Sequence, residues 1–324
     1  MVKKYAIFFI VFYAFFCQAQ IADTLPVQKP QKSIEKYDDY IKLRLGLSNS
    51  FNSFRIKDKT SRLDFTLSPN QRLRSTLTLI YKFIEVDLGY TPEFLRFNKD
   101  DAIKGHTKFY NLGTRLYFGQ WMQELQYAKT KGFYIDKNDV GLENNILFPH
   151  FQVQKIGGST SYVFNPDFSF RAIFLQSEWQ QKSAGSFVPS ISYYFTQIKN
   201  NNPSKDHVFD IAIGPGYYYN WVIHNKFLIS AGTYSGLGFN STKTIYSDGT
   251  PHEISESLSF QAQFRLTAGY NSERFFAGAA TSLNSFSYSS ESLIHVEDQQ
   301  QFLEFYIGYR FKAPKRISSL FEKK

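Results

Sequence analysis

Few residues in this chain combine the types and the spacing that catalysis requires. The candidates for a general base are six histidines. They are His106, His150 and His207 at the starts of expected strands, His224 in a short turn, and His252 and His295 in longer loops. None of them lies on a well-patterned inner face next to a candidate serine, so no nucleophile–base pair can be assigned. The sequence also has no P-loop, zinc-protease or EF-hand motif. We therefore expect no enzyme, no cofactor and no metal site, with a hydrolase built from converging loop residues as the open alternative.

The single cysteine, Cys17, lies in a predicted signal peptide over residues 1–19. Two lysines precede an apolar stretch over 6–16, and Cys17-Gln18-Ala19 fits a small-x-small cleavage site. The apolar stretch is too short to cross a bilayer as a helix. Phenylalanines stand where a lipoprotein signal needs small residues, so ordinary cleavage after Ala19 is favoured. The mature chain would then have no cysteine, which excludes disulfides, thiol catalysis and cysteine-bound metals.

The composition points to β-structure in a chain of 324 residues. Aromatic residues make up 18%, mostly phenylalanine and tyrosine, while mean hydropathy is only −0.34. These values exclude a protein of many transmembrane helices and a disordered chain. The formal charge is +9, and loss of Lys3 and Lys4 with the signal leaves +7. Because no basic helix or lysine–arginine stripe occurs, we expect anionic lipid headgroups or sugars as neighbours and no nucleic acid.

A period of two residues runs through the chain from Tyr40 onward. Apolar and polar residues alternate over 41–48, 258–270 and 303–311, which places the apolar side chains on one face of a strand. Similar segments lie near 40–56, 61–80, 84–92, 106–118, 121–135, 150–164, 168–179, 186–198, 207–221, 226–240, 255–270, 275–289 and 300–312.

The lengths and connections of these segments predict an all-β fold, an antiparallel transmembrane β-barrel of the bacterial outer membrane. Short turns alternate with longer connections at 93–105, 136–149, 241–254 and 290–299, so the turns would be periplasmic and the loops extracellular. Thirteen segments conflict with the even number that such barrels have, and the conflict falls across 180–206. Either one segment there does not cross, or 61–80 is broken at Ser68-Pro69-Asn70. Twelve or fourteen strands follow, and twelve is favoured.

If the apolar rows face lipid, the opposite rows line the lumen and carry charges of both signs. Because bases and acids nearly balance, we expect ion pairs that fill part of the interior. The predicted lumen charges are Lys42, Arg44, Glu85, Asp87, Arg115, Glu124, Arg171, Asp210, Arg265, Glu304 and Arg310.

Three stretches resemble one family of exported proteins, the domain of unknown function 4421. They are Asp64-Phe65-Thr66-Leu67-Ser68-Pro69-Asn70, the run RAIFLQSEWQQKSAGSF over 171–187, and PGYYYNWV over 215–222. Their spacing is also similar, and the resemblance covers about residues 38–313. The resemblance implies a Gram-negative bacterium of the Bacteroidetes type and an outer-membrane location. It implies no activity and no site residues.

The second of these stretches falls where the strand count fails. Glu178, Trp179 and Lys182 lie in a connection, and we expect residues 178–187 to pack into or cap the mouth of the barrel. A surface loop anchored by an interfacial tryptophan is the alternative.

The sequence therefore predicts a signal peptide over 1–19, a flexible periplasmic leader over 20–39, a barrel over 40–312 and a basic tail over 313–324. We expect a monomer in outer-membrane lipid that passes or binds a small polar solute or surface ligand. One alternative is a barrel with a filled lumen whose loops bind a partner; another is the hydrolase. A soluble exported barrel would have to turn its charged rows outward.

Overall fold

The structure is a computed structural model, and it describes residues 33–315 except 60, 83, 93, 175–176, 200–203, 249 and 291–293. Side chains of 84–87, 289–290 and 294 also lie outside the description. The predicted signal peptide, the leader before Ser33 and the tail from 316 are outside the described residues.

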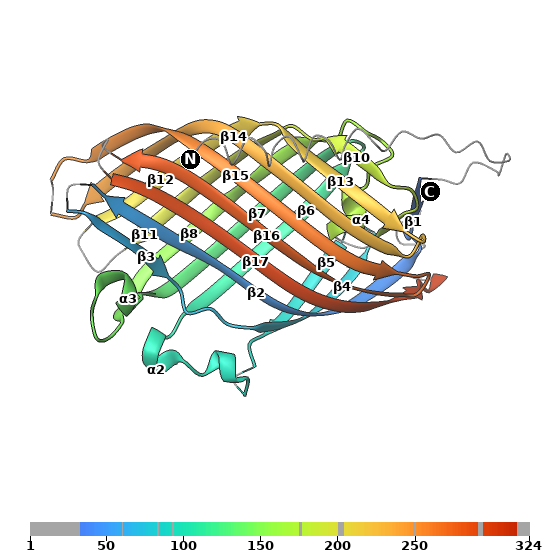
Figure 1. Cartoon of the computed structure of the whole chain (residues 1–324), viewed down its shortest axis with the longest axis horizontal. Helices are drawn as coiled ribbons and strands as arrows, with labels where there is room; N and C mark the ends of the chain where they lie inside the picture. The colour runs from blue at the N-terminus through green and yellow to red at the C-terminus, as the bar shows by residue number, and fades with distance from the viewer. Residues whose placement is uncertain are drawn as a thin grey trace, which may run out of the picture. The chain divides into compact units, whose positions relative to one another are not determined.

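Ten strands form a closed antiparallel circuit (Figure 1). In order around the barrel they are β14 (Phe227–Tyr246), β12 (Ser204–Gly214), β11 (Ser190–Lys199), β8 (Ile146–Tyr162), β7 (Trp121–Ile135), β3 (Leu63–Ser68), β2 (Tyr40–Asp58), β17 (Ile294–Lys312), β16 (Phe275–Ser290) and β15 (Glu253–Asn271), which pairs with β14. This closed antiparallel wall is the outer-membrane barrel architecture that the alternation predicts.

Additional segments enter the wall toward the end where the described chain begins and finishes. They are β4 (Arg74–Tyr81) beside β2, β5 (Ile84–Tyr90) beside β4, β6 (Lys108–Phe118) beside β7, β13 (Gly216–Ile223) beside β14, and β10 (Ala184–Phe187) beside β13.

Three of the strands are interrupted at prolines, which lack the N–H that a ladder needs. Pro69 separates β3 from β4, Pro189 separates β10 from β11, and Pro215 separates β12 from β13. The predicted break at Ser68-Pro69-Asn70 is confirmed. When each interrupted pair is counted once, the described wall has twelve strands, the favoured number.

The predicted strand over 168–179 is wrong, and this error explains the odd count. The segment contains a short helix, α4 (Phe170–Phe174), and the strand β9 (Glu178–Gln180), which pairs only with β1 (Ile34–Lys36) in the two-stranded sheet. Phe170, Ile173 and Phe174 have helical spacing, and their burial rather than a strand alternation determines the local structure.

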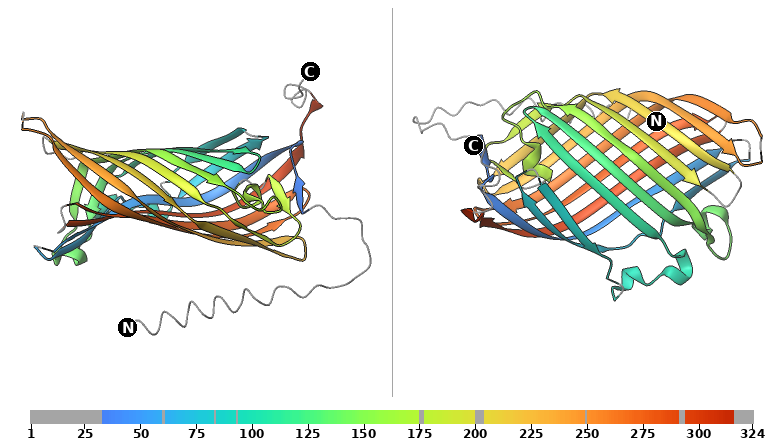
Figure 2. Two further views of the ribbon diagram at one scale, coloured as in Figure 1. Left: turned by 90° about the horizontal axis from the view of Figure 1, so that it is seen from above. Right: turned by 180° about the vertical axis from the view of Figure 1, so that it is seen from behind.

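The two ends of the barrel differ in their connections (Figure 2). The end that holds both described termini has short turns at 82–83, 119–120, 224–226 and 272–274, and we call it the short-turn end. At the other end, the long-loop end, two long connections contain η1 (Arg96–Asn98), α2 (Asp101–Lys104) and α3 (Lys137–Val140). The long loops expected over 241–254 and 290–299 are instead mostly strand, because β14 extends to Tyr246, β15 begins at Glu253 and β17 begins at Ile294.

The outer face is apolar and the inner face is polar, as the alternation predicts. Leu45, Phe305 and Ile307 are more than half exposed on the outside, whereas Lys42, Asp210 and Arg310 are buried inside. None of the helices in the described part of the chain is long and apolar enough to span a membrane.

Candidate binding chamber

The connection between β8 and β10 folds into the lumen and closes its short-turn end; we call residues 163–183 the plug. Phe168, Phe170 and Ile173 of the plug form a buried cluster with wall residues Met122 and Tyr218. The ring of Phe170 meets that of Tyr218 edge-on at 4.8 Å. Apolar packing therefore holds the plug against the wall.

Polar contacts position the plug as well. Gln180, which is 1% exposed, accepts from the backbone N–H of Ser169 at 2.9 Å and from the Asn220 amide at 3.2 Å. The Asn220 amide also donates to the Ser169 carbonyl at 3.1 Å. Buried amides with several partners favour one geometry over its alternatives. The plug is thus a defined part of the fold.

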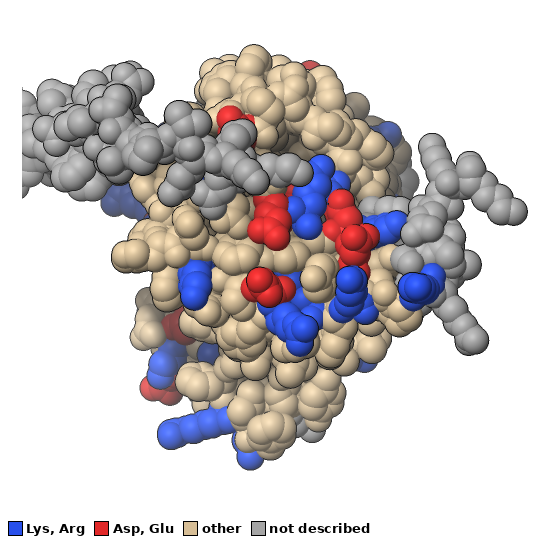
Figure 3. All heavy atoms as spheres, turned by 90° about the vertical axis from the view of Figure 1, so that its right-hand side faces the viewer, with Lys and Arg blue, Asp and Glu red and all other residues tan. Residues whose placement is uncertain are grey.

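The last residues of the expected leader attach to the plug. β1 pairs with β9, and the backbone N–H of Tyr37 donates to Ser177 at 3.1 Å. Tyr37 stacks on Trp179 at 6.2 Å between ring centroids, and the Arg310 guanidinium lies 4.0 Å from the Tyr37 ring centre. Residues 33–39 are therefore part of the closure. Figure 3 shows this end, where cationic and anionic side chains lie intermingled on the surface.

The lumen is also filled toward the long-loop end. Phe54, Leu67, Phe133, Ile135 and Val153 form a second buried cluster there. Beside it, the Lys155 ammonium contacts Asp298 Oδ2 at 2.8 Å and lies between the rings of Phe286 and Tyr194, at 4.1 and 4.7 Å from their centres. In the described residues, packed side chains thus occupy both ends of the lumen.

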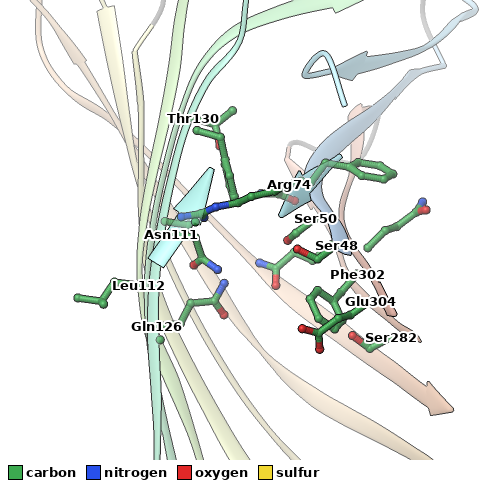
Figure 4. Close-up of a pocket in the computed structure, with 18 of the residues that line it drawn as sticks. Ser48, Ser50, Arg74, Asn111, Leu112, Gln126, Thr130, Ser282, Phe302 and Glu304 are labelled. Atoms are coloured by element: carbon green, nitrogen blue, oxygen red, sulfur yellow. The ribbon is translucent and has the colours of Figure 1, made fainter. Parts of the chain in front are cut away.

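A chamber of about 980 Å³ remains between these two fillings (Figure 4). Its floor is Phe174 at the end of α4, and three arginines converge on this residue. Arg115 and Arg265 each place the guanidinium carbon 4.3 Å from the Phe174 ring centre, and Arg44 donates to the Phe174 carbonyl at 3.4 Å.

The chamber is lined by more bases than acids. The basic residues on its wall are Arg44, Arg72, Arg74, Lys108, Arg115, Lys155 and Arg265, and the acidic residues are Glu124 and Glu304. Arg115 contacts Glu124 at 2.6 Å, Arg44 lies 3.9 Å from Glu304, and Arg72 contacts Asp101. Within the described residues, Arg265 and Arg74 have no carboxylate within 4.0 Å. Among the described residues, the chamber therefore presents positive charge without a carboxylate partner.

The structure brings several predicted lumen charges to this chamber and leaves others elsewhere. Arg44, Arg115, Glu124, Arg265 and Glu304 line it. Glu85 and Asp87 belong to β5, but their side chains lie outside the described residues.

The remaining predicted charges occupy the two filled ends. Lys42 is fully buried, and its ammonium has no hydrogen-bond partner among the described residues. Asp210 is buried and accepts from Asn240 at 2.6 Å. Arg310 donates to the Ser272 carbonyl at 2.7 Å. Arg171 belongs to α4 rather than to the wall, and it lies 3.8 Å from Glu178.

The three predicted cap residues lie at the short-turn end, with different environments. Glu178 is buried inside the plug and accepts a hydrogen bond from Ser169, while Trp179 is half-buried against Tyr37. Lys182 is exposed. The inward packing lies mainly over 168–180, since 184–187 is the wall strand β10.

Several charged lumen residues do not belong to the predicted set: the chamber residues Arg72, Arg74 and Lys108, and the buried pair of Lys155 and Asp298. Lys155 follows the outward–inward alternation of β8, so the parity of its neighbours could have revealed it. Asp298 lies in a segment that was predicted as a loop, and side chains in a loop do not alternate between the inner and the outer face.

Comparison with known proteins identifies the family of this chain. Residues 31–311 match the family model described as Domain of unknown function (DUF4421). No curated protein matches the chain. Among solved structures, the chain is similar to the outer membrane protease OmpT from Escherichia coli, with 7% identity, a TM-score of 0.41, and coverage of 86% of this chain and 98% of that one. It is also similar to the Pseudomonas putida toluene transporter TodX, with 7% identity, a TM-score of 0.24, and coverage of 85% and 90%. The outer membrane protein OmpT of Vibrio cholerae has 10% identity, a TM-score of 0.33, and coverage of 84% and 97%.

Proposed function

Since the chain belongs to the DUF4421 family, whose description assigns no function, we propose a function from the chamber itself: an exported outer-membrane barrel that binds a small anionic solute in its lumen. The outward rows of exposed leucine, phenylalanine and isoleucine support the membrane location, because such rows are stable only against lipid. The predicted signal peptide supports export. The two filled ends favour binding over conduction.

This proposal rests on the surroundings of the Arg265 guanidinium. Its guanidinium is held against the Phe174 ring and faces the chamber, with no carboxylate partner among the described residues. Stacking on a ring face leaves the in-plane N–H groups of a guanidinium available to an acceptor. An oxyanion in the chamber would accept these N–H groups as charge-assisted hydrogen bonds. Arg115 lies over the same ring and Arg44 donates to the Phe174 carbonyl, but these two guanidiniums have Glu124 and Glu304 as carboxylate partners.

The test is equilibrium dialysis of the folded, detergent-solubilised protein with radiolabelled inorganic phosphate. We expect saturable binding, and we expect Arg265→Gln to weaken it about tenfold or more, because hydrogen bonds to a charged group are lost. Arg55→Gln is the matched control, since Arg55 pairs with Asp64 on the exposed part of the barrel. Absence of phosphate binding, or equal binding by the Arg265 and Arg55 variants, would contradict the proposal.

Planar-bilayer recording tests the choice of binding over passage. Folded, inserted protein is expected to show no steady openings, because the plug and the buried cluster at Phe54 and Phe133 block the lumen. Steady, salt-dependent conductance would contradict this part of the proposal.

A hydrolase is the second candidate, on one specific contact. Ser287 Oγ lies 2.9 Å from His295 Nε2, the distance of a nucleophile and its base. Both residues lie toward the long-loop ends of β16 and β17. A fluorophosphonate probe would label Ser287 if the pair is active, and labelling would disappear in Ser287→Ala but persist in Ser285→Ala. No labelling of the folded protein would eliminate this candidate.

A further inference from the structure

The chamber has an open side, and it lies in the wall between β5 and β6. Among the described residues, β5 pairs only with β4 and β6 pairs only with β7, so no ladder joins β5 to β6. We call this unpaired boundary the seam. Both strands lie on the side seen in the right-hand view of Figure 2.

The lining of the chamber shows that it extends through the seam. In a strand with neighbours on both sides, only alternate residues can face the lumen. In β6, however, consecutive residues from Lys108 to Arg115 all line the chamber. In Figure 4, Leu112 points to the opposite side of the strand from Asn111 and Gln126. The chamber therefore reaches around the free edge of β6 to the outer face.

At the long-loop end of the seam, several contacts fix the connection from β5 to β6 away from the seam. The connection from β5 to β6 is anchored on residues 70–73 between β3 and β4. Asn98, which is buried, donates to the carbonyls of Leu73 and Pro92 at 3.0 and 2.7 Å and accepts from the Leu73 N–H at 2.9 Å. Asn70 donates to Asp101 at 3.0 Å and to the Gly105 carbonyl at 2.9 Å. These contacts direct the connection toward β3 and β4.

A cation lies at the seam. A Cβ built on Gly89 of β5 would lie 2.0 Å from Arg74 Nε, so the Arg74 guanidinium occupies the space that the missing side chain leaves. In Figure 4 the Arg74 side chain extends toward the side of the chamber that holds Asn111 and Leu112. Arg74 at the seam and Arg265 at the floor thus form a cationic path inward.

The outside of the seam is apolar. Leu88 and Tyr90 of β5 and Tyr110 and Leu112 of β6 are each more than half exposed there, at 67%, 64%, 56% and 63%. In a barrel placed in lipid, these side chains contact acyl chains. The opening therefore joins an apolar exterior to a cationic interior.

We propose that the seam admits a single-chain amphiphile with an anionic headgroup from the surrounding membrane. The headgroup binds in the chamber between Arg74 and Arg265, and the alkyl chain leaves through the seam past Leu112 and Tyr110. This proposal rests on the proposed anion-binding function and names the class of ligand. A soluble anion would satisfy the arginines but would leave the seam without a role.

The experiment compares two probes that share a headgroup. Inorganic phosphate reports the chamber alone, and dodecyl phosphate in lipid nanodiscs reports the chamber and the seam together. Dodecyltrimethylammonium, with the same chain and the opposite charge, is the charge control. Bound amphiphile is measured by native mass spectrometry, and bound phosphate by equilibrium dialysis.

Leu112→Gln and Leu88→Gln are the variants that make the outer side of the seam polar, since both side chains are exposed there. Leu266→Gln is the matched control, because Leu266 is exposed on β15, away from the seam. Mobility on an unheated gel verifies that each variant is folded.

We expect Leu112→Gln and Leu88→Gln to weaken dodecyl phosphate binding about tenfold, because the tail loses apolar contact, while phosphate binding stays within about twofold. Leu266→Gln should change neither. Equal binding of dodecyl phosphate by the wild type and both seam variants would overturn the proposal. Binding of phosphate without binding of dodecyl phosphate would also overturn it and leave the anion chamber standing. Binding of neither probe would refute the proposed function itself.

Discussion

The buried pair of Lys155 and Asp298 gives the sharpest prediction about stability. The two side chains are 3% and 6% exposed, and Lys155 Nζ lies 2.8 Å from Asp298 Oδ2. Asp298→Ala would leave the Lys155 cation in the packed lumen between Tyr194 and Phe286. Breaking a buried pair from one side costs about 3–5 kcal/mol.

Two features of the site place the expected loss at the lower end of that range. The rings of Tyr194 and Phe286 remain as cation–π partners, worth about 0.5–2 kcal/mol. Asp210 is a second carboxylate in the same part of the lumen, and its charge acts on Lys155. We therefore expect Asp298→Ala to lower the free energy of unfolding by about 3 kcal/mol.

The assay is reversible urea unfolding of the barrel in lipid vesicles, monitored by tryptophan fluorescence. The matched control is Asp64→Ala, which breaks the Arg55–Asp64 pair at the same 2.8 Å but with side chains 42% and 48% exposed. The control should cost far less, because exposed ion pairs contribute little to stability. The double variant Lys155→Met with Asp298→Leu should recover most of the loss, since it buries no charge. Equal costs for Asp298→Ala and Asp64→Ala, or a double variant as unstable as the single one, would refute the reasoning.

Two further predictions concern the connection between β5 and β6. Gly132 has φ +94°, and a Cβ there would lie 2.2 Å from the carbonyl oxygen of His106. Gly132→Ala should therefore destabilise the barrel by at least about 2 kcal/mol in the same urea assay. An unchanged midpoint of the urea unfolding curve would contradict this prediction. Burial raises the pKa of Asp101, but hydrogen bonds from Arg72 and His106 outweigh this effect and hold the pKa below its ordinary value of 3.8. A lowered carboxyl pKa contributes stability above the unfolded value that is lost as pH falls through the folded one. The protection of amides over 91–107, taken relative to the intrinsic exchange rate at each pH, should therefore be higher at about pH 5 than at about pH 2.5, whereas Asp101→Asn should show no such step; identical profiles would contradict this role.

The wall of the barrel could be predicted because every spanning strand has to turn one face to lipid. The alternation of leucine, phenylalanine and tyrosine with polar residues in β2, β15 and β17 records this constraint directly. The same parity identified Arg44, Arg115, Arg265 and Glu304 as lumen residues. Their pairing then follows from the register, since Arg115 lies directly opposite Glu124.

The ends of the strands could not be predicted in the same way. β14 continues through Thr242, Lys243 and Thr244 to Tyr246, where neither face is apolar. Beyond the hydrocarbon region a strand has no lipid to face, so its side chains carry no alternation even though its ladder continues. Loops were therefore predicted where the structure has paired strands.

The helical first part of the plug was predicted as a strand for a different reason. Over Phe168 to Phe174 the apolar residues are too few to separate a helix turn from a strand. What determines the local structure is the partner: Met122 and Tyr218 belong to distant parts of the chain, and only the closed barrel brings them around α4. The structure of such a segment depends on its tertiary contacts with the barrel wall, and these contacts cannot be read from its own sequence.

An unpaired strand edge is the most unusual feature of this wall, and its energetics bear on function. Each backbone N–H or carbonyl left without a partner in hydrocarbon costs several kcal/mol, which is why barrels close. The long-loop half obeys this rule, since β3 pairs directly with β7 through Leu67 and Ser68. The short-turn half departs from it by inserting β5 and β6 without joining them. Such an edge is stable only if polar groups reach it, and the Arg74 guanidinium lies beside β5 at Gly89. Closing the seam would remove this cost but would also seal the chamber, whose two ends are already filled. The seam is therefore best understood as the entrance that the filled lumen requires.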